Sequence, residues 1–195
     1  ESDMSATIST IFTATVRPTL PLAPGFHVSA PVKGSGKSFL CDLIGIFATP
    51  GVVAKVSFPS NEAEATKVIL GLLMKKEAVI VFDDMSADWK PYGSIKRIFT
   101  AETVTDRQLG GNKMVTVNTQ VLILSSGNNV DVKEDLQRRI ITIRLDPRCE
   151  IPAMLSYKKC PLEEMKRNRE HFIFLVLRII AAYIAEGSPK GDVKN

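Results

Sequence analysis

The stretch that decides the fold is Ser29-Ala30-Pro31-Val32-Lys33-Gly34-Ser35-Gly36-Lys37-Ser38. A β-like run, 26–30, leads into it, and an apolar, helix-like run from Phe39 to Phe47 follows it. A strand, a glycine-containing loop and a helix in this order are the setting of a loop that cradles phosphates. Backbone N–H groups of 34–38 can point at phosphate oxygens, and the helix N-terminus adds partial positive charge.

The end of this loop carries the reactive side chains. Lys37 would reach the β- and γ-phosphates of ATP, and the Ser38 hydroxyl would ligate Mg²⁺. ATP and Mg²⁺ are therefore the predicted cofactors, with these nucleotide contacts: Gly34, Ser35, Gly36, Lys37, Ser38 and Phe39. Pro31 stands where the pattern G-x-x-x-x-G-K-[ST] has its first glycine. The alternative interpretation is a helix N-cap rich in small residues.

Length and composition predict one globular domain. The 195 residues are 45% hydrophobic and 24% charged, which is ordinary for a chain that buries a real core. We expect a helix and proline-rich lead-in over 1–25, a core over 26–147 and a C-terminal helical segment over 148–195. A net charge of +4 is compatible with nucleic acid but is not evidence for it.

The cysteines and the apolar runs bear on where the protein works. Three widely spaced cysteines with no C-x-x-C pair disfavour a structural zinc site and favour reduced, cytoplasmic thiols. The most apolar run, 172–185, contains Arg178 and is too short for a membrane span, so we predict a buried helix there. Because the chain opens on polar residues without Met, we expect it to be a piece of a longer protein.

Strands alternate with helices along the chain, which predicts an α/β domain with a largely parallel sheet of five strands. The expected strands are 26–30, 52–56, 78–82, 120–125 and 140–145. The expected helices are 5–16, 37–48, 61–75, 92–101 and 132–138, followed by one long helix or a pair of helices over 162–186, and a hairpin pairs 103–105 with 115–117. Such sheets bind ligands at the carboxyl ends of their strands, where the polar motifs of this chain lie.

Asp83 and Asp84 follow five apolar residues, which is typical of a Walker B element. Asp83 would hold the water shell of Mg²⁺, and Asp84 could act as the general base toward the attacking water. A solvated strand end is the alternative.

Two further pairs of polar residues, one of asparagines and one of arginines, are candidates for the site. Asn128-Asn129 comes after a strand predicted to lie beside the Walker B strand, where an amide could orient water or touch the γ-phosphate. Ordinary turn chemistry explains the pair equally well. Arg138-Arg139 precedes the last strand, and in a ring of subunits one of these arginines could reach a neighbour's γ-phosphate. An exposed charge pair is the alternative.

The predicted hairpin is basic near its tip. Arg107 and Lys113 flank Gly110-Gly111 and could contact nucleic-acid phosphates, although a solvated hairpin is the alternative. No aromatic residue interleaves here, so such contacts would be sequence-tolerant. Trp89 and Tyr92 are predicted to pack rather than to stack on bases.

Five motifs in this order resemble the ATPase domain of replicative helicases of phages and integrated mobile elements. They are A-P-V-K-G-S-G-K-S, V-I-V-F-D-D, T-D-R-Q-L-G-G-N-K-M-V-T-V, L-S-S-G-N-N-V and D-L-Q-R-R-I-I-T-I-R-L-D-P. That group is AAA+-like, close to superfamily 3 and MCM-type helicases, and often fused to or paired with a primase. With the lead-in and the tail, the resemblance covers nearly the whole chain.

The resemblance implies roles for individual residues. Lys37 and Ser38 match Walker A, Asp83 and Asp84 match Walker B, Asn128 or Asn129 matches sensor 1 with Asn128 preferred, and Arg138 or Arg139 matches the arginine finger. The segment 105–115 matches the hairpin before sensor 1, which faces the channel of ring helicases, with Arg107 and Lys113 as the DNA contacts. Asp84 stands where many AAA+ proteins carry Glu, and no sensor 2 arginine is evident in the tail.

The function implied is an ATP-driven DNA helicase or translocase motor with an AAA+ P-loop fold. It would work as a hexamer on single-stranded or forked DNA, with a primase domain or protein as partner, in the cytoplasm of a bacterial host and without a membrane. Its rivals are an AAA+ loader or protein-remodelling ATPase, an ATP-gated DNA-binding module with little turnover, and a small-molecule kinase.

Overall fold

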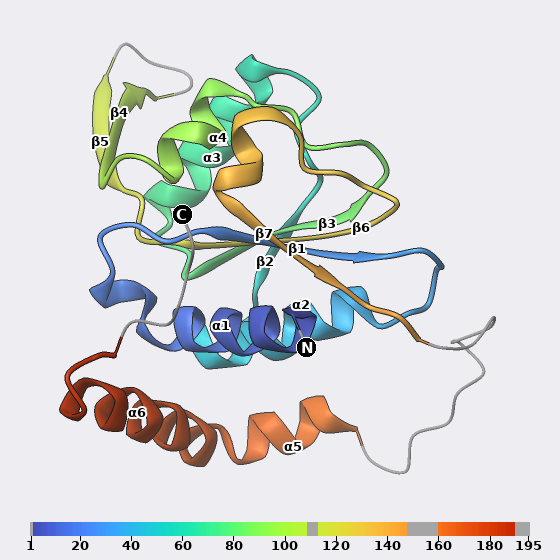
Figure 1. Cartoon of the computed structure of the whole chain (residues 1–195). Coiled ribbons are helices and arrows are strands. Elements are labelled where there is room, and N and C mark those ends of the chain that lie inside the picture. Colours follow the sequence, from blue (N-terminus) through green and yellow to red (C-terminus); the bar gives the residue numbers. More distant parts are fainter. Residues whose placement is uncertain (1, 109–112, 148–159, 190–195) are drawn as a thin grey trace.

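Five parallel strands form the central sheet of the computed structural model, which describes residues 2–108, 113–147 and 160–189 (Figure 1). The strands are β1 (Gly25–Ala30), β2 (Ala54–Val56), β3 (Val79–Met85), β6 (Leu122–Asn128) and β7 (Ile140–Arg144). Their order across the sheet is β2-β3-β6-β1-β7, and all four neighbouring pairs are parallel. The predicted α/β class and five-stranded parallel sheet are thus confirmed.

Helices cover both faces of this sheet (Figure 1). On one face lie α1 (Ser2–Val16) and α2 (Lys37–Ala48), with α5 (Pro161–Arg167) and α6 (Arg169–Ala185) packed beyond them. On the other lie α3 (Glu62–Met74), α4 (Gly93–Ile98) and the 3₁₀ turn η2 (Glu134–Arg138). Another 3₁₀ turn, η1 (Arg17–Thr19), ends α1. Strands covered on both faces must be apolar throughout, as β3 and β6 largely are.

Side chains alternate between two cores because successive strand residues point to opposite faces. Phe26 and Val28 of β1 face the core under α1 and α2, and Ile80 and Phe82 of β3 face the core under α3 and α4. Trp89 belongs to the second core at 2% exposure. Trp89 and Tyr92 form an aromatic cluster with Phe58, so their predicted packing role is confirmed.

The antiparallel hairpin is present as β4 (Thr103–Arg107) and β5 (Met114–Asn118). It forms its own two-stranded sheet beside α3 and α4 and joins β6 directly (Figure 1). The predicted turn at Gly110-Gly111 lies outside the described residues. The hairpin root lies at the amino ends of β3 and β6, whereas the phosphate-loop candidate follows the carboxyl end of β1.

Several element boundaries differ from prediction. β3 and β6 run three residues further, so Asp83 and Asp84 lie within β3 rather than after it. The pairing of β3 with β6 shifts register between Phe82 and Met85, which admits two polar residues before the strand ends. The predicted helix 92–101 stops at Ile98, and the predicted helix 132–138 is the 3₁₀ turn η2.

The prediction of a buried helix over 172–185 is wrong. The segment is helical and a break near Asn168 separates α5 from α6, but Val176 is the only buried residue of α6. Phe174, Ile179 and Ile184 are each more than half exposed. Only one face of α6 meets α1 and α2, and within the described residues nothing covers the rest. No helix in the described part of the chain is long and apolar enough to cross a membrane.

Candidate nucleotide site

Two glycines give the loop before α2 its shape. Gly34 and Gly36 have φ of 75° and 85°, the left-handed region that favours glycine. A side chain at Gly36 would meet no atom within 4 Å, so the backbone angle and not crowding calls for glycine there. The Ser35 hydroxyl closes the loop by donating to the Val32 carbonyl at 2.6 Å. The loop therefore presents the free N–H groups at the start of α2 to the carboxyl edge of the sheet.

The side chain of Lys37 extends from α2 to β6, the strand that follows the hairpin. Its Nζ donates to Asn128 Oδ1 at 2.7 Å and lies 3.4 Å from the Val32 carbonyl oxygen. Burial lowers the pKa of Lys37, and the charges of Asp84 and Asp83 oppose that shift. Asn128 is thus the asparagine of the pair that reaches Lys37, whereas Asn129, with φ of 52°, forms the turn after β6.

Asp83 is the acceptor of three further hydrogen bonds in the site. Its Oδ1 accepts from the hydroxyls of Ser38 at 2.7 Å and Ser126 at 2.6 Å, and from the Asp84 N–H at 3.1 Å. Burial favours the neutral acid, but these hydrogen bonds and the charge of Lys55 outweigh it and lower the pKa of Asp83. The carboxylate is therefore held ionised beside the Ser38 hydroxyl.

The oxygen donors suit Mg²⁺. This ion prefers one or two carboxylates, with waters and phosphate oxygens filling the remaining positions. Ser38 and Asp83 supply a hydroxyl and a carboxylate in direct contact, on α2 and β3. In the described residues no group of three or more His, Cys, Asp or Glu could hold a metal by itself. An ion here would therefore depend on phosphate oxygens as well as on these two residues.

Lys55, Asp42 and Ser126 belong to the site but were not predicted from the sequence. Lys55 on β2 pairs with Asp42 Oδ1 of α2 at 2.8 Å and lies 3.7 Å from Asp83 Oδ2. Burial disfavours the charged lysine, but Asp42 and Asp83 outweigh burial and raise its pKa. These residues meet only because β2 and β6 flank β3, an order that local sequence does not encode.

Asp84 follows Asp83 in β3 but has a left-handed backbone conformation. Its φ is 50°, unusual for a residue other than glycine, and its N–H also donates to Ser126 Oγ at 3.2 Å. The side chain is exposed. Asp84 is therefore an exposed carboxylate whose charge still acts on Lys37.

The remaining predicted residues are not brought to Lys37. Phe39 is 38% exposed in the first turn of α2. Arg138 and Arg139 lie at the amino end of β7, and the Arg139 carbonyl accepts from the first residue of β1. A five-residue strand is about 16 Å long, so both arginines lie that far along the sheet from the carboxyl edge. Arg139 donates twice to Asp135 at 3.1 Å, whereas Arg138 is exposed and has no ion pair among the described residues.

The hairpin residues also lie apart from this site. Arg107 ends β4, Lys113 precedes β5, and both are exposed. The Gln108 N–H donates to the Lys113 carbonyl at 2.9 Å, which continues the ladder toward the tip. Arg97 of α4 pairs with Asp106 at 2.9 Å and ties the hairpin to the core.

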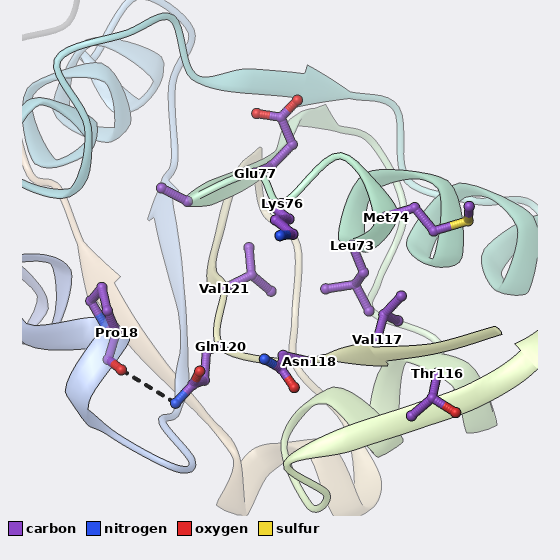
Figure 2. Close-up of a pocket in the computed structure, with 11 residues that line it drawn as sticks. Pro18, Leu73, Met74, Lys76, Glu77, Thr116, Val117, Asn118, Gln120 and Val121 are labelled. Atoms are coloured by element: carbon purple, nitrogen blue, oxygen red, sulfur yellow. Dashed lines mark hydrogen bonds between the residues drawn. The ribbon is translucent and has the colours of Figure 1, made fainter.

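Two cavities of about 450 Å³ lie elsewhere. Figure 2 shows the first cavity, which lies between the end of α3 and the hairpin root. Its lining includes Leu73, Lys76 and Val121. Gln120 donates to the Pro18 carbonyl at its edge. Its lining residues include Ala78 and Val121 before the first residues of β3 and β6, so it lies at the opposite end of the strands from Lys37. The second cavity lies against β7 and η2, near Asp131.

Comparisons with known proteins place the fold. No protein-family model and no curated protein matches the chain. The apo structure of the NrS-1 C-terminal region is similar over 89% of this chain at a TM-score of 0.59 and 16% identity. This chain spans 41% of that one, so it corresponds to less than half of it. A weaker similarity is to JCV helicase, at a TM-score of 0.43 and 14% identity, over 86% of this chain and 51% of that one. Another is to NtrX from Brucella abortus in complex with ATP, at a TM-score of 0.46 and 19% identity, over 74% of this chain and 37% of that one. At these identities the comparison with NrS-1 establishes the fold alone.

Proposed function

We propose that this chain binds ATP with Mg²⁺ and hydrolyses it. The observation that carries the proposal is the convergence of Lys37, Ser38, Asp83 and Asn128 at the first turn of α2. Lys37 would release Asn128 in part to contact the β- and γ-phosphates, and the N–H groups of 34–39 would bind phosphate oxygens. Ser38 and Asp83 would hold Mg²⁺, which neutralises charge on the phosphates when bound.

Hydrolysis then needs an oriented water. Water attacks the γ-phosphorus, the bond to the bridging oxygen of ADP breaks, and the water proton passes to Asp84 as general base. Asn128, held by Lys37 before ATP binds, would orient that water or contact the γ-phosphate. Asp84 is shorter than the Glu of many AAA+ proteins. Its charge acts on Lys37, and its exposed carboxylate would meet the attacking water from the solvent side of the site.

A neighbouring subunit would complete the site. An arginine stabilises the charge of a phosphoryl-transfer transition state, yet both candidate arginines lie far along the sheet from Lys37 in the same chain. Arg138 is favoured over Arg139 because Asp135 already binds Arg139. This arrangement supports a ring, which we propose to be a hexamer.

The motor activity we propose is DNA unwinding or translocation, in replication of a phage or mobile element and alongside a primase. The supporting observation is the exposed basic end of the hairpin, whose root continues directly into β6 and so into Asn128. A change at Asn128 would therefore be passed along β6 and β5 to Lys113, and across the hairpin pairing to Arg107, and both residues would contact the DNA backbone.

The test is ATP turnover with and without single-stranded and forked DNA. We expect Lys37→Ala to abolish turnover and Asp84→Ala to lower it at least a hundredfold while ATP binding persists. Arg107→Ala with Lys113→Ala should remove stimulation by DNA but leave basal turnover. Lys75→Ala with Lys76→Ala, which removes equal charge away from the hairpin tip, is the control.

Other outcomes identify the rival functions. Turnover without any DNA stimulation would favour a loader or protein-remodelling ATPase. ATP-dependent DNA binding with scarcely any turnover would favour a gated binding module. Equal turnover of the wild-type chain and Lys37→Ala would contradict the proposed nucleotide site.

A further inference from the structure

A fully buried histidine lies behind the candidate site. His27 is in the middle of β1, with no exposed surface, between β6 and β7. Its Nδ1 lies 2.7 Å from Ser125 Oγ, and its Nε2 lies 3.2 Å from the Val130 carbonyl oxygen. Burial lowers the pKa of His27 to about 4, so the ring is neutral at pH 7.

The partners determine where the single ring proton resides. A carbonyl oxygen can only accept, so Nε2 must carry the hydrogen and donate to Val130. Nδ1 is then the acceptor, and the Ser125 hydroxyl donates to it. The imidazole thus links Ser125 of β6 to Val130 in the turn at the end of that strand.

That turn presents Asn128 to Lys37. It runs from Gly127 to Asp131 and reverses sharply at Asn129, whose φ is positive. Val130 folds back so closely that a Cβ on Gly127 would lie 2.7 Å from its Cγ2. Beyond it, the Asp131 carbonyl accepts from the Trp89 N–H and the Asp131 N–H donates to Asp88.

We propose that His27 is a positioning residue for Asn128, acting through its Nε2–H bond to the Val130 carbonyl. The hydrogen bonds of His27 go to Ser125 and Val130, and the bond to Val130 fixes the turn that aims the Asn128 amide at Lys37. The proposal rests on the proposed ATP hydrolysis, because Asn128 acts on water or phosphate only in that reaction.

A pair of substitutions separates the two ring nitrogens. The His27→Gln amide extends to the place of Nε2 and can still donate to Val130. The His27→Asn amide ends near the place of Nδ1, so it keeps Ser125 and loses Val130. Both remove the ring, which makes each a control for the packing loss of the other.

Steady-state ATP turnover of the 195-residue chain with DNA present is the first measurement. We expect His27→Asn to lower kcat roughly tenfold or more, because a small misplacement of a positioned group is costly. KM and ATP binding should change little, since the phosphate loop is untouched. His27→Gln should recover most of kcat. Hydrogen exchange over 127–132 is the second measurement, and it should be faster in His27→Asn than in His27→Gln.

Equal kcat and equal exchange in the two variants would overturn the role of His27. The same holds if both variants lose ATP binding and melting temperature together, since that is a packing effect. If the wild-type chain and Lys37→Ala do not differ in turnover, the proposed function fails instead. Exchange over 127–132, which needs no turnover, then decides alone whether His27 holds the turn.

Discussion

Asp83 illustrates how much of this site depends on single atoms. One oxygen, Oδ1, accepts from two hydroxyls and a backbone N–H, while Oδ2 faces Lys55. Each donor stabilises the ionised carboxylate, which is the form that a divalent cation needs. Ser126, buried on β6, contributes one of these donors.

Ser126→Ala is therefore expected to weaken metal use. Loss of one hydrogen bond to a charged carboxylate costs about 1.5 kcal/mol, which corresponds to roughly a tenfold higher Mg²⁺ concentration for half-maximal ATP turnover. Mg²⁺ titrations of the wild type and the variant measure it. Ser125→Ala is the matched control, because that neighbouring hydroxyl contacts His27 and not Asp83. Superimposable titrations would contradict this role of Ser126.

The buried neutral state of His27 also makes stability depend on pH. Its pKa is about 4 in the folded chain against 6.5 in the unfolded chain, so between these values the unfolded chain binds a proton that the folded chain does not. The free energy of unfolding should therefore fall as the pH falls from about 6.5 to 4. The nearby charge of Asp131 acts against the shift. This contribution amounts to about 3 kcal/mol.

Urea unfolding at pH 7 and pH 4 measures this contribution. Wild-type protein should lose about 3 kcal/mol more than His27→Gln, which does not titrate. His171→Gln, which replaces the second histidine at an exposed position, is the matched control for the substitution itself. A pH dependence unchanged in His27→Gln would show that other groups carry it.

At the scale of elements, short apolar runs and turn residues were enough to predict most of the sheet and the hairpin. The unbroken apolar run 78–82 marks a strand covered on both faces, and β3 contains it. The extent of β3 was not predictable, because Asp83 and Asp84 stay in the strand only through contacts with β6. Ser126, Lys55 and His27 were missed for the same reason: their partners depend on strand order.

The C-terminal apolar run, 172–185, shows a case in which the helix was predictable but its burial was not. An apolar run expresses a tendency to be buried but does not say what will bury it. α6 meets α1 and α2 along the face of Val176 alone, and Phe174 and Ile184 remain exposed in the described chain. Helix formation was therefore predictable over 172–185, and burial was not.

Arg17 joins two elements that the sequence separates by a hundred residues. It is 2% exposed and donates to the carbonyls of Leu20 at 2.5 Å, Thr119 at 2.9 Å and Val121 at 3.0 Å. Burial lowers its pKa. The end of α1 is thereby fixed to the connection between the hairpin and β6.

Arg17→Met keeps most of the side-chain volume but leaves these carbonyls without their donor. Relief of a buried charge offsets part of the loss, and we expect a net destabilisation of about 2 kcal/mol. Arg17→Lys should not restore it, because one ammonium cannot match the planar fork of the guanidinium. Arg107→Met, at an exposed position, is the control and should leave the melting temperature unchanged. A stable Arg17→Met protein would contradict the anchoring role.

At the scale of the whole molecule, the proposed ATPase site is divided between the two ends of the sheet. Lys37 and Asp83 lie at the carboxyl edge, while Arg138 lies near the amino end of β7. A head-to-tail ring brings unlike surfaces of neighbouring subunits together, so a residue from one can complete the site of the next. A chain with this division should be a poor ATPase when its subunits are separated.

Mixing two inactive variants tests that division. Lys37→Ala and Arg138→Ala should each be inactive alone, for opposite reasons. In a random mixed ring, about a quarter of the interfaces pair an intact Lys37 with an intact Arg138, so turnover should return to roughly a quarter of the wild-type rate. Mixing Lys37→Ala with Asp83→Ala is the control and should restore no ATP turnover, because both residues belong to one subunit's half of the site.

If Arg138→Ala is fully active while Arg139→Ala is the variant that complements Lys37→Ala, then ATP binding must release Arg139 from Asp135. If neither arginine variant complements, the site is completed within one chain and the ring mechanism is wrong.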